Sequence, residues 1–377
     1  MSRNALKVLA LGLLAAAMPT LGCTRAGTPM TGDLAPRARY DCLIIPNAEH
    51  PDNVITSEGF PTYYRADGAP QDDPVRPKAS VPFPSMGTTF TVSVFDLEPS
   101  RAIAAINAVM GRLTDLTNKL NVFDAESETS VVNRDAGTRA VPIDDDLEAR
   151  IRYSRRAAEL SGGVFDPTVG PLTSLWRANR KAGRVPGDDE IAKAKALVGF
   201  DKVLVAGRRG AWTVKFAKPG QAFDFGGIAK GWATEEAVKV LLQYGSRSAV
   251  IFSGDARVIG RRPNRTPFRV GISNPRPPHE TLYVVPLTNA CIDTSGYYEQ
   301  FTMIDGKRYS HIIDPRSGRA IPGLASVSVV GPDATWCDAL STTIGILGVD
   351  EGLKLIERVN KGEKLPVTSS PSQGEGG

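Results

Sequence analysis

Regular apolar periodicity runs through one continuous stretch of this chain, residues 81–361, and is missing from both of its ends. Within the stretch, short alternating patterns typical of strands outnumber the patterns with helical spacing. Because too few helices are present to connect all the strands as crossovers, we expect an α+β layer fold with a mixed sheet and short helices. A chain of 377 residues then holds one sizeable domain with disordered tails.

The expected elements follow from the spacing of apolar residues and from helix-end signals. We expect Ser100 to cap a helix whose buried face carries Ile103, Ile106, Met110 and Leu113. The other expected helices are residues 147–160, 228–244, 338–347 and 351–359. The expected strands are residues 90–95, 203–205, 212–216, 249–252, 268–272, 282–287 and 326–330.

The first 22 residues resemble an export signal. Arg3 and Lys7 precede an apolar run over residues 8–18, which is far shorter than the ~20 residues of a membrane-spanning helix. Gly22 and Cys23 resemble a bacterial lipoprotein cleavage site, although Thr20 stands where such sites usually have leucine. We therefore expect an exported protein on the periplasmic side, lipid-anchored to the cell membrane at Cys23, with soluble secretion as the alternative.

The two ends flanking the patterned domain have compositions that disfavour a packed core. Residues 23–80 are rich in Pro, Asp, Arg and Gly, which indicates a tether or loosely ordered extension, and residues 362–377 are expected to form a disordered tail. The net charge of +4 is spread without a basic stripe, so no nucleic-acid partner is expected. Besides Cys23, the cysteines have no metal-type spacing and predict no disulfide framework; Cys291 and Cys337 are expected to be small buried hydrophobes.

The segment FDFGGIAKG, residues 223–231, joins a short strand to a predicted helix. Adjacent glycines allow the backbone to approach a ligand closely, and the free N–H groups at a helix start favour an anion. Lys230 adds a positive charge one turn into the helix. The pattern is neither a P-loop nor a dinucleotide fingerprint, so a plain glycine turn is the alternative.

Asp338 and Thr342 are four residues apart on a predicted helix, which places both side chains on one face. One carboxylate with a hydroxyl is a plausible half-site for Mg²⁺, which fills its other positions with water, carbonyls and phosphate. A carboxylate that merely caps the helix start is the alternative.

His311 is one of three histidines and lies in the segment SHIIDPRSG, residues 310–318, which ends in a tight turn. Functional side chains are often displayed on such turns, although a lone histidine is more often structural. No G-x-S-x-G nucleophile signature is present.

Taken together and in order, eight segments between Met86 and about Ile356 resemble the ApbE family, the FAD:protein FMN transferases. The segments are MGTTFTV (86–92), SETSVVN (127–133), SGGVFDPTVGPL (161–172), FDFGGIAKG (223–231), SGD (253–255), TSGYY (294–298), HIIDPRSG (311–318) and DALSTTIGILG (338–348). The resemblance implies a T-fold-like α+β domain over residues 81–361.

The resemblance also implies a ligand set. Asp338, Thr342 and the backbone carbonyl of Gly227 would hold Mg²⁺. The implied flavin contacts are Met86, Phe123, Val164, Phe165, Asp166, Asp224, Lys230 and Ile312. Two departures stand out: residues 120–123 read LNVF where the family often has Met-Ser-Thr-Tyr, so one wall of the site differs, and Glu235 stands where an aspartate is usual.

The implied activity is Mg²⁺-dependent transfer of FMN from FAD to a Thr or Ser hydroxyl of an acceptor flavoprotein, with release of AMP. Such acceptors are exported or membrane-bound flavoproteins, for example subunits of sodium-pumping quinone reductases with a short Asp- and Thr-containing motif. We expect His311 to be the general base, because an unperturbed histidine pKa near ~6.5 suits neutral pH, with Asp255 as the second candidate. The alternatives are an Mg²⁺-dependent FAD pyrophosphatase giving FMN and AMP, and a non-catalytic FAD-binding lipoprotein.

Overall fold

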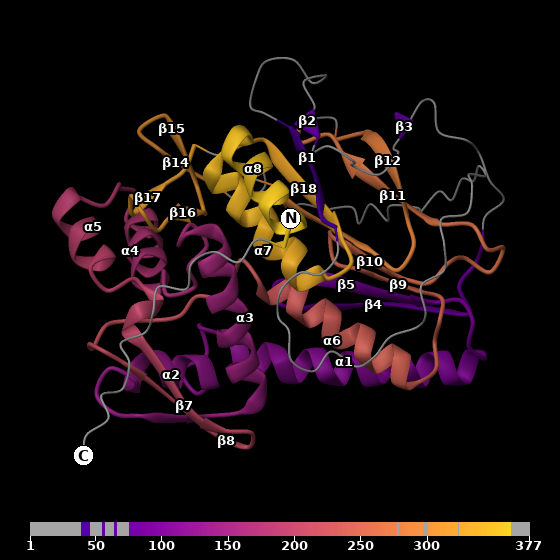
Figure 1. The fold of residues 1–377 in the computed structure, drawn as a ribbon, viewed down its shortest axis with the longest axis horizontal. Helices are drawn as coiled ribbons and strands as arrows, with labels where there is room; N and C mark the ends of the chain where they lie inside the picture. The colour runs from indigo at the N-terminus through magenta and orange to yellow at the C-terminus, as the bar shows by residue number, and fades with distance from the viewer. Residues whose placement is uncertain are drawn as a thin grey trace, which may run out of the picture.

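The computed structural model describes residues 39–45, 55–56, 64–65, 75–276, 279–296, 301–322 and 324–362. Its centre is an eight-stranded sheet in the order β2-β1-β18-β13-β10-β9-β5-β4 (Figure 1). The strands are β1 (Asp41–Ile45), β2 (Ile55–Thr56), β4 (Ala79–Ser85), β5 (Thr88–Val94), β9 (Ala249–Phe252), β10 (Ala256–Ile259), β13 (Cys291–Gly296) and β18 (Ser326–Gly331).

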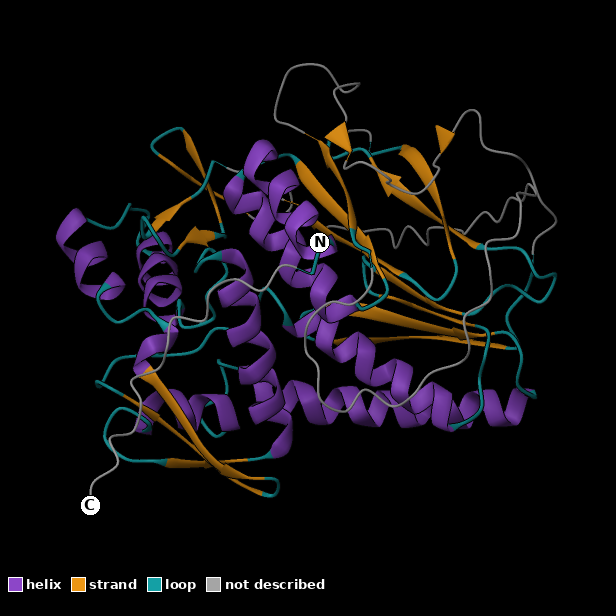
Figure 2. Cartoon of the chain, viewed as in Figure 1, coloured by secondary structure: helices purple, strands orange, loops and turns teal. Residues whose placement is uncertain are grey.

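The two faces of this sheet are covered differently, which gives three layers (Figure 2). On one face lie the helices α1 (Pro99–Leu120), α6 (Ala229–Gln243), α7 (Ala334–Leu347) and α8 (Val349–Asn360). On the other lies a smaller sheet of β3 (Tyr64–Arg65), β11 (Phe268–Ser273) and β12 (Thr281–Leu287). In β1, Cys42 and Ile44 face the helical layer and Leu43 and Ile45 face the smaller sheet, so the strand is buried on both sides.

The remaining elements form a lobe beside the ends of α6 and α7 (Figure 1). Within the lobe, a three-stranded sheet in the order β6-β8-β7 lies at the bottom of the view, and two small hairpins, β14-β15 and β16-β17, lie at the top. The elements are α2 (Glu128–Asp135), β6 (Val141–Ile143), α3 (Asp145–Ser161), α4 (Gly170–Lys181), α5 (Asp188–Lys195), the 3₁₀ helix Phe200–Lys202, β7 (Val203–Arg208), β8 (Ala211–Phe216), β14 (Phe301–Ile304), β15 (Lys307–Ser310), β16 (Ile313–Asp314) and β17 (Arg319–Ala320).

The α+β class is confirmed, with two differences in detail. The ladders among the described strands are antiparallel, where we expected a mixed sheet. We also expected short helices, whereas α1 has 22 residues. The expected strands and helices are present, within a few residues of their predicted bounds.

The predicted start of the first helix is wrong, and its predicted buried face is wrong at Ile103 but right at Ile106 and Leu113. The helix begins at Pro99, its N-cap is Glu98, and no side chain caps it, so Ser100 is already inside the first turn. Ile103 is 48% exposed. The buried face is formed by Ala102, Ala105, Ile106, Val109, Leu113 and Leu116. Two alanines therefore belong to a face that we predicted from large apolar side chains alone.

The predicted tether over residues 23–80 is wrong for residues 41–45, 55–56, 64–65 and 79–80, which belong to strands. Residues 41–45 form β1, which pairs with β18 through five residue pairs, and residues 79–80 begin β4. The apolar run after Asp41 is only four residues long, and the Pro- and Asp-rich sequence around it hid its strand character. The signal peptide, Cys23 and residues 363–377 of the predicted tail lie outside the described residues.

Within the described part of the chain, none of the helices combines the length and the apolar character needed to cross a membrane. Cys42, Cys291 and Cys337 are buried free thiols, and the Sγ atoms of Cys291 and Cys337 are 3.1 Å apart in the main core.

A buried carboxyl group joins α2 to α3. Glu128 opens α2, and its Oε1 accepts a hydrogen bond of 2.6 Å from the backbone N–H of Asp144, the N-cap of α3. Its Oε2 is buried without a hydrogen-bond partner. Burial therefore raises the pKa of Glu128 to about 7.

This raised pKa predicts how stability depends on pH. The fold favours the protonated form, so the contribution of Glu128 to the free energy of unfolding is fully present below its ordinary pKa near 4.5 and is lost as pH rises through about 7. Glu128→Gln is neutral at every pH and keeps the acceptor oxygen. We expect its stability in urea to fall less than that of the wild type between pH 5 and pH 8, with the exposed Glu126→Gln as control. Parallel curves for Glu128→Gln and the wild type would contradict this account.

Candidate active site

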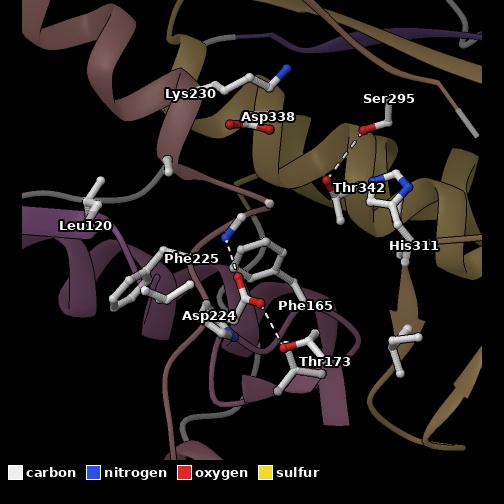
Figure 3. Close-up of a pocket in the computed structure, with 18 of the residues that line it drawn as sticks. Leu120, Phe165, Thr173, Asp224, Phe225, Lys230, Ser295, His311, Asp338 and Thr342 are labelled. Carbon is white, nitrogen blue, oxygen red and sulfur yellow. Dashed lines mark hydrogen bonds between the residues drawn. The ribbon is translucent and has the colours of Figure 1, made fainter. Parts of the chain in front are cut away.

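A cavity of about 640 Å³ opens where the lobe meets the first turns of α6 and the middle of α7. Its wall is drawn from short segments far apart in the sequence, most of them within the eight motifs. The segments are residues 86–87, 117–123, 164–177, 224–230, 294–296, 311–315 and 338–346. Figure 3 shows the side chains that these segments direct into the cavity.

The turn before α6 is held from both sides. The side-chain amide of Asn133 bonds both backbone groups of Phe223, at 2.7 and 2.9 Å. One carboxylate oxygen of Asp224 accepts from the N–H of Gly226 at 3.0 Å, and the other accepts from the hydroxyl of Thr173 at 2.8 Å (Figure 3). These contacts fix the glycine turn on the cavity wall while Phe223 is buried below it.

Two glycines let α6 and its preceding turn approach α7 closely. A Cβ atom on Gly231 would lie 2.1 Å from the carbonyl oxygen of Ala334, so only glycine fits there. A Cβ atom on Gly227 would lie 3.2 to 3.3 Å from Phe165 and from both branches of Thr342. The backbone of Gly227 therefore lies directly against the Thr342 hydroxyl.

Asp338 faces the same junction. It lies in the second turn of α7, which begins at Ala334 with Asp333 as its N-cap, so Asp338 does not cap the helix as the alternative interpretation proposed. One of its carboxylate oxygens accepts from the N–H of Gly231 at 2.9 Å. Burial raises its pKa to about 6, against the opposing effect of Lys230.

Lys230 lies among three carboxylates. It forms an ion pair with Asp255, and the charges of Asp293 and Asp338 also act on it. Burial alone would lower the pKa of Lys230, but these three carboxylates raise it above its ordinary value, so the ammonium stays charged. Burial, followed by repulsion from Asp255 and Asp338, raises the pKa of Asp293 well above its usual range. The site thus gathers more acidic groups than cations.

The donor atoms at this junction suit Mg²⁺. The carboxylate of Asp338, the hydroxyl of Thr342 and the carbonyl of Gly227 are all oxygens, the ligands that this hard cation prefers. Gly227 is also the position at which a side chain would fill the space beside Thr342. The described residues contain no group of three or more His, Cys, Asp or Glu side chains that could hold a metal ion. The residues present therefore fit Mg²⁺.

A chain of hydroxyl groups connects β13 to α7 beside this junction. The Ser295 hydroxyl is 2.8 Å from that of Ser341 and 3.4 Å from that of Thr342 (Figure 3). Ser341 in turn donates to Asp293 at 2.8 Å. Ser295 of the sheet thus contacts Thr342, and Ser341 of α7 holds Asp293 of the sheet.

The two candidate bases differ in their surroundings. His311 follows β15 directly, is exposed, and lines the cavity near Thr342 (Figure 3). Asp255 does not line the cavity; one oxygen accepts from the N–H of Thr294 at 2.7 Å and the other pairs with Lys230. With both oxygens engaged, Asp255 is better placed to hold Lys230 than to accept a proton from a ligand.

The structure brings all the other predicted site residues to this one cavity. Met86, Phe123, Val164, Phe165, Asp166, Asp224, Lys230, Ile312, Gly227, Asp338 and Thr342 line it. Phe123 is 76% exposed. One carboxylate oxygen of Asp166 accepts hydrogen bonds from the N–H and the hydroxyl of Thr168, at 2.8 and 2.7 Å. This oxygen therefore orders the loop.

Sequence reasoning missed one side of the cavity. Thr173 and Arg177 lie one turn apart on α4, and the Arg177 guanidinium lies 4.7 Å from the centre of the Phe123 ring and 3.7 Å from Asp224. Their spacing of four residues was a usable signal, but no helix was predicted over these residues.

Comparison with known proteins gives a consistent result. Residues 86–365 match the ApbE family. The FAD:protein FMN transferase of Treponema pallidum is 32% identical over 289 residues, covering 72% of this chain and 79% of the relative, and that of Haemophilus influenzae is 28% identical over 288 residues, covering 73% and 82%. The crystal structure of the ApbE protein of Thermotoga maritima is 30% identical with a TM-score of 0.67, covering 75% and 91%. The apo crystal structure of Pseudomonas stutzeri flavinyl transferase ApbE is 29% identical with a TM-score of 0.65, covering 74% and 88%.

The fit at Gly227 can be tested by adding one methyl group. Gly227→Ala would push the turn away from Thr342 and Phe165, so we expect Mg²⁺ affinity, measured by calorimetric titration, to fall roughly 10- to 100-fold. Gly111→Ala, where a Cβ meets nothing within 4 Å, is the control and should bind like the wild type. Unchanged Mg²⁺ affinity in Gly227→Ala would remove Gly227 from the proposed ligand set.

Proposed function

This chain belongs to the ApbE family and is a FAD:protein FMN transferase, and we propose that it transfers FMN from FAD to a Thr or Ser hydroxyl of an acceptor flavoprotein, with Mg²⁺ as cofactor and AMP as the second product. The observation that carries the proposal is one cavity in which an oxygen-only donor set, a charged lysine and an exposed histidine meet. Each of the three suits one part of a phosphoryl-group transfer.

The first part is the stabilisation of negative charge. In a phosphoryl-group transfer, a protein acts chiefly by positioning the reactants and by placing cations near the developing negative charge. Lys230, the second residue of α6, supplies a permanent positive charge at the cavity wall. Asp338, Thr342 and the carbonyl of Gly227 would hold Mg²⁺, which would supply Lewis-acid polarisation of a phosphate oxygen.

The second part is the position of the lysine. Asp255 accepts from Thr294 and pairs with Lys230, and Asp293 is fixed by Ser341, so the ammonium is held from the β13 side. Because its position is set before FAD binds, little reorganisation is needed when the phosphates arrive.

The third part is the proton. The acceptor oxygen forms a bond to the FMN-side phosphorus, the phosphoanhydride bond breaks, and AMP leaves with the bonding electron pair. His311 takes the hydroxyl proton, since it lines the cavity and is not buried. Asp255 is the weaker candidate because both of its oxygens are engaged.

The residues of the site disfavour a non-catalytic FAD-binding protein but are compatible with a pyrophosphatase. A non-catalytic FAD-binding protein would have no need for the metal donors, and Asp338 and Thr342 are both present and turned to the cavity. A pyrophosphatase would use the same residues, with water in place of the acceptor hydroxyl.

The location of the enzyme rests on its first residues alone. We place it outside the cytoplasm on the periplasmic side, anchored by lipid at Cys23, where exported acceptor flavoproteins would be within reach. The export-type sequence before Gly22 and Cys23 supports this placement.

Replacing Asp338, the proposed carboxylate ligand of Mg²⁺, tests the stabilisation of negative charge. Asp338→Ala should keep the fold but lower FMN attachment to an acceptor roughly a thousandfold or more, because the metal contributes several kcal/mol and the remaining donors carry no charge. Lys230→Ala should weaken FAD binding and turnover by roughly 10- to 100-fold, the usual effect of losing a charged hydrogen bond. Asp350→Ala, an exposed carboxylate on α8, is the control. Wild-type transfer with unchanged Mg²⁺ dependence in Asp338→Ala would overturn the metal assignment.

The identity of the base is tested by a pH profile. We expect His311→Gln to lower the transfer rate roughly 10²–10⁴-fold and to abolish the acidic limb of the rate profile, while FAD affinity changes little. If the acidic limb survived in His311→Gln and disappeared in Asp255→Asn, the two roles would have to be exchanged.

Anchoring is tested by fractionation of the cell. The wild type should be found in the membrane fraction with lipid at a new N-terminal Cys23, and Cys23→Ala should lose both. A soluble wild-type protein with an unmodified N-terminus outside the cytoplasm would refute the lipid anchor and leave export standing.

A further inference from the structure

The hairpin of β14 and β15 rises from the rim of the cavity. The segment before it, Thr294–Gly296, and the segment after it, His311–Ile313, both line the cavity. The hairpin projects from the lobe above α4 (Figure 1). Anything that lies along it is therefore next to the cavity opening.

The two faces of the hairpin have different surroundings. On the inner face Ile304 is buried and Tyr309 contacts Trp176 of α4, with ring centres 5.8 Å apart. On the outer face Phe301 is 43% exposed and Met303 is 56% exposed. Arg308 is paired with Met303 across the hairpin, and its guanidinium lies 3.8 Å from the centre of the Phe301 ring. The hairpin is thus packed on one side and presents an apolar face with a cation on the other.

Exposed apolar side chains gather at this opening. The large hydrophobic residues exposed in the described part of the chain are Ile103, Phe123, Leu204, Leu242, Phe301 and Met303. Three of the six, Phe123, Phe301 and Met303, belong to the cavity wall or to the hairpin. Grouped exposed apolar residues mark interaction surfaces more often than scattered ones do.

We propose that the outer face of this hairpin, formed by Phe301, Met303 and Arg308, binds the acceptor protein through an extended segment that carries the reactive hydroxyl. The proposal rests on the proposed function, since a protein acceptor has to pass the cavity rim to reach the bound FAD. An acceptor segment that lies along β15 would end beside His311, the first residue after that strand.

The same surface indicates the chemistry of the segment. Phe301 and Met303 suit an apolar side chain, and Met adapts to varied partners. The charged residue of this face is Arg308, so the face favours a carboxylate near the hydroxyl residue. An extended segment also fits a two-stranded sheet, to which peptides can add as a further strand.

The test separates acceptor binding from FAD chemistry. The variant is Phe301→Ser with Met303→Ser, and the matched control is Leu204→Ser with Leu242→Ser, two exposed leucines that do not line the cavity. The probe is the exported domain of a sodium-pumping quinone reductase subunit with an Asp- and Thr-containing motif. We expect the KM for this acceptor to rise tenfold or more in the hairpin variant, with kcat and FAD affinity within about twofold of the wild type. The control should match the wild type.

The outcomes distinguish the two claims. Wild-type transfer together with an unchanged KM in the hairpin variant would overturn the docking surface and leave the proposed function intact. Failure of the wild type to attach FMN to the probe would overturn both.

A cross-link provides a second measurement that needs no catalysis. With p-benzoylphenylalanine replacing Phe301 in the Asp338→Ala background, light should link the enzyme to the acceptor, and the same replacement at Leu242 should not. A cross-link from position 301 to a second copy of the enzyme, with none to the acceptor, would show that the hairpin serves self-association and would refute the proposal.

Discussion

The close approach of α6 to α7 is the contact on which the rest of the site depends. It is possible because Gly231 has no side chain where Ala334 presents its carbonyl, and it is fixed by the hydrogen bond from Gly231 to Asp338. The same approach brings Gly227 against Thr342 and places Lys230 beside the buried carboxylates. One helix contact therefore assembles groups that lie more than a hundred residues apart in the sequence.

This assembly concentrates charge in a place that water reaches poorly. Asp255, Asp293 and Asp338 surround Lys230, and burial raises the pKa of Asp293 and Asp338. Perturbed carboxylates gathered beside a cavity are typical of functional sites, because folding alone gains little from them. A divalent cation bound at the proposed Mg²⁺ site would offset the excess of negative charge, which is a physical reason for oxygen donors around Asp338. Selection for function, more than stability, explains why the cluster exists.

Sequence reasoning could predict the parts of the site that local patterns encode. The glycine turn and the pair Asp338 and Thr342 are visible from spacing, and both lie on the cavity as expected. Arg177 and Asp293 were missed because their relevance comes from tertiary contacts with Phe123 and with Lys230. β1 was missed for a similar reason, since its short apolar run becomes a strand only by pairing with β18, almost three hundred residues away. Ile103 shows the opposite error, because its helical spacing predicted burial whereas it is 48% exposed and Ala102 and Ala105 lie on the buried face.

The central claim is that the cavity transfers FMN to a protein hydroxyl and does not merely split FAD. The most direct test measures AMP release and protein-bound FMN in the same reaction with purified enzyme, FAD, Mg²⁺ and an acceptor protein. The account predicts one FMN attached to a Thr or Ser for each AMP released, and neither product without Mg²⁺. Release of AMP with an equal amount of free FMN, and an acceptor of unchanged mass, would contradict it.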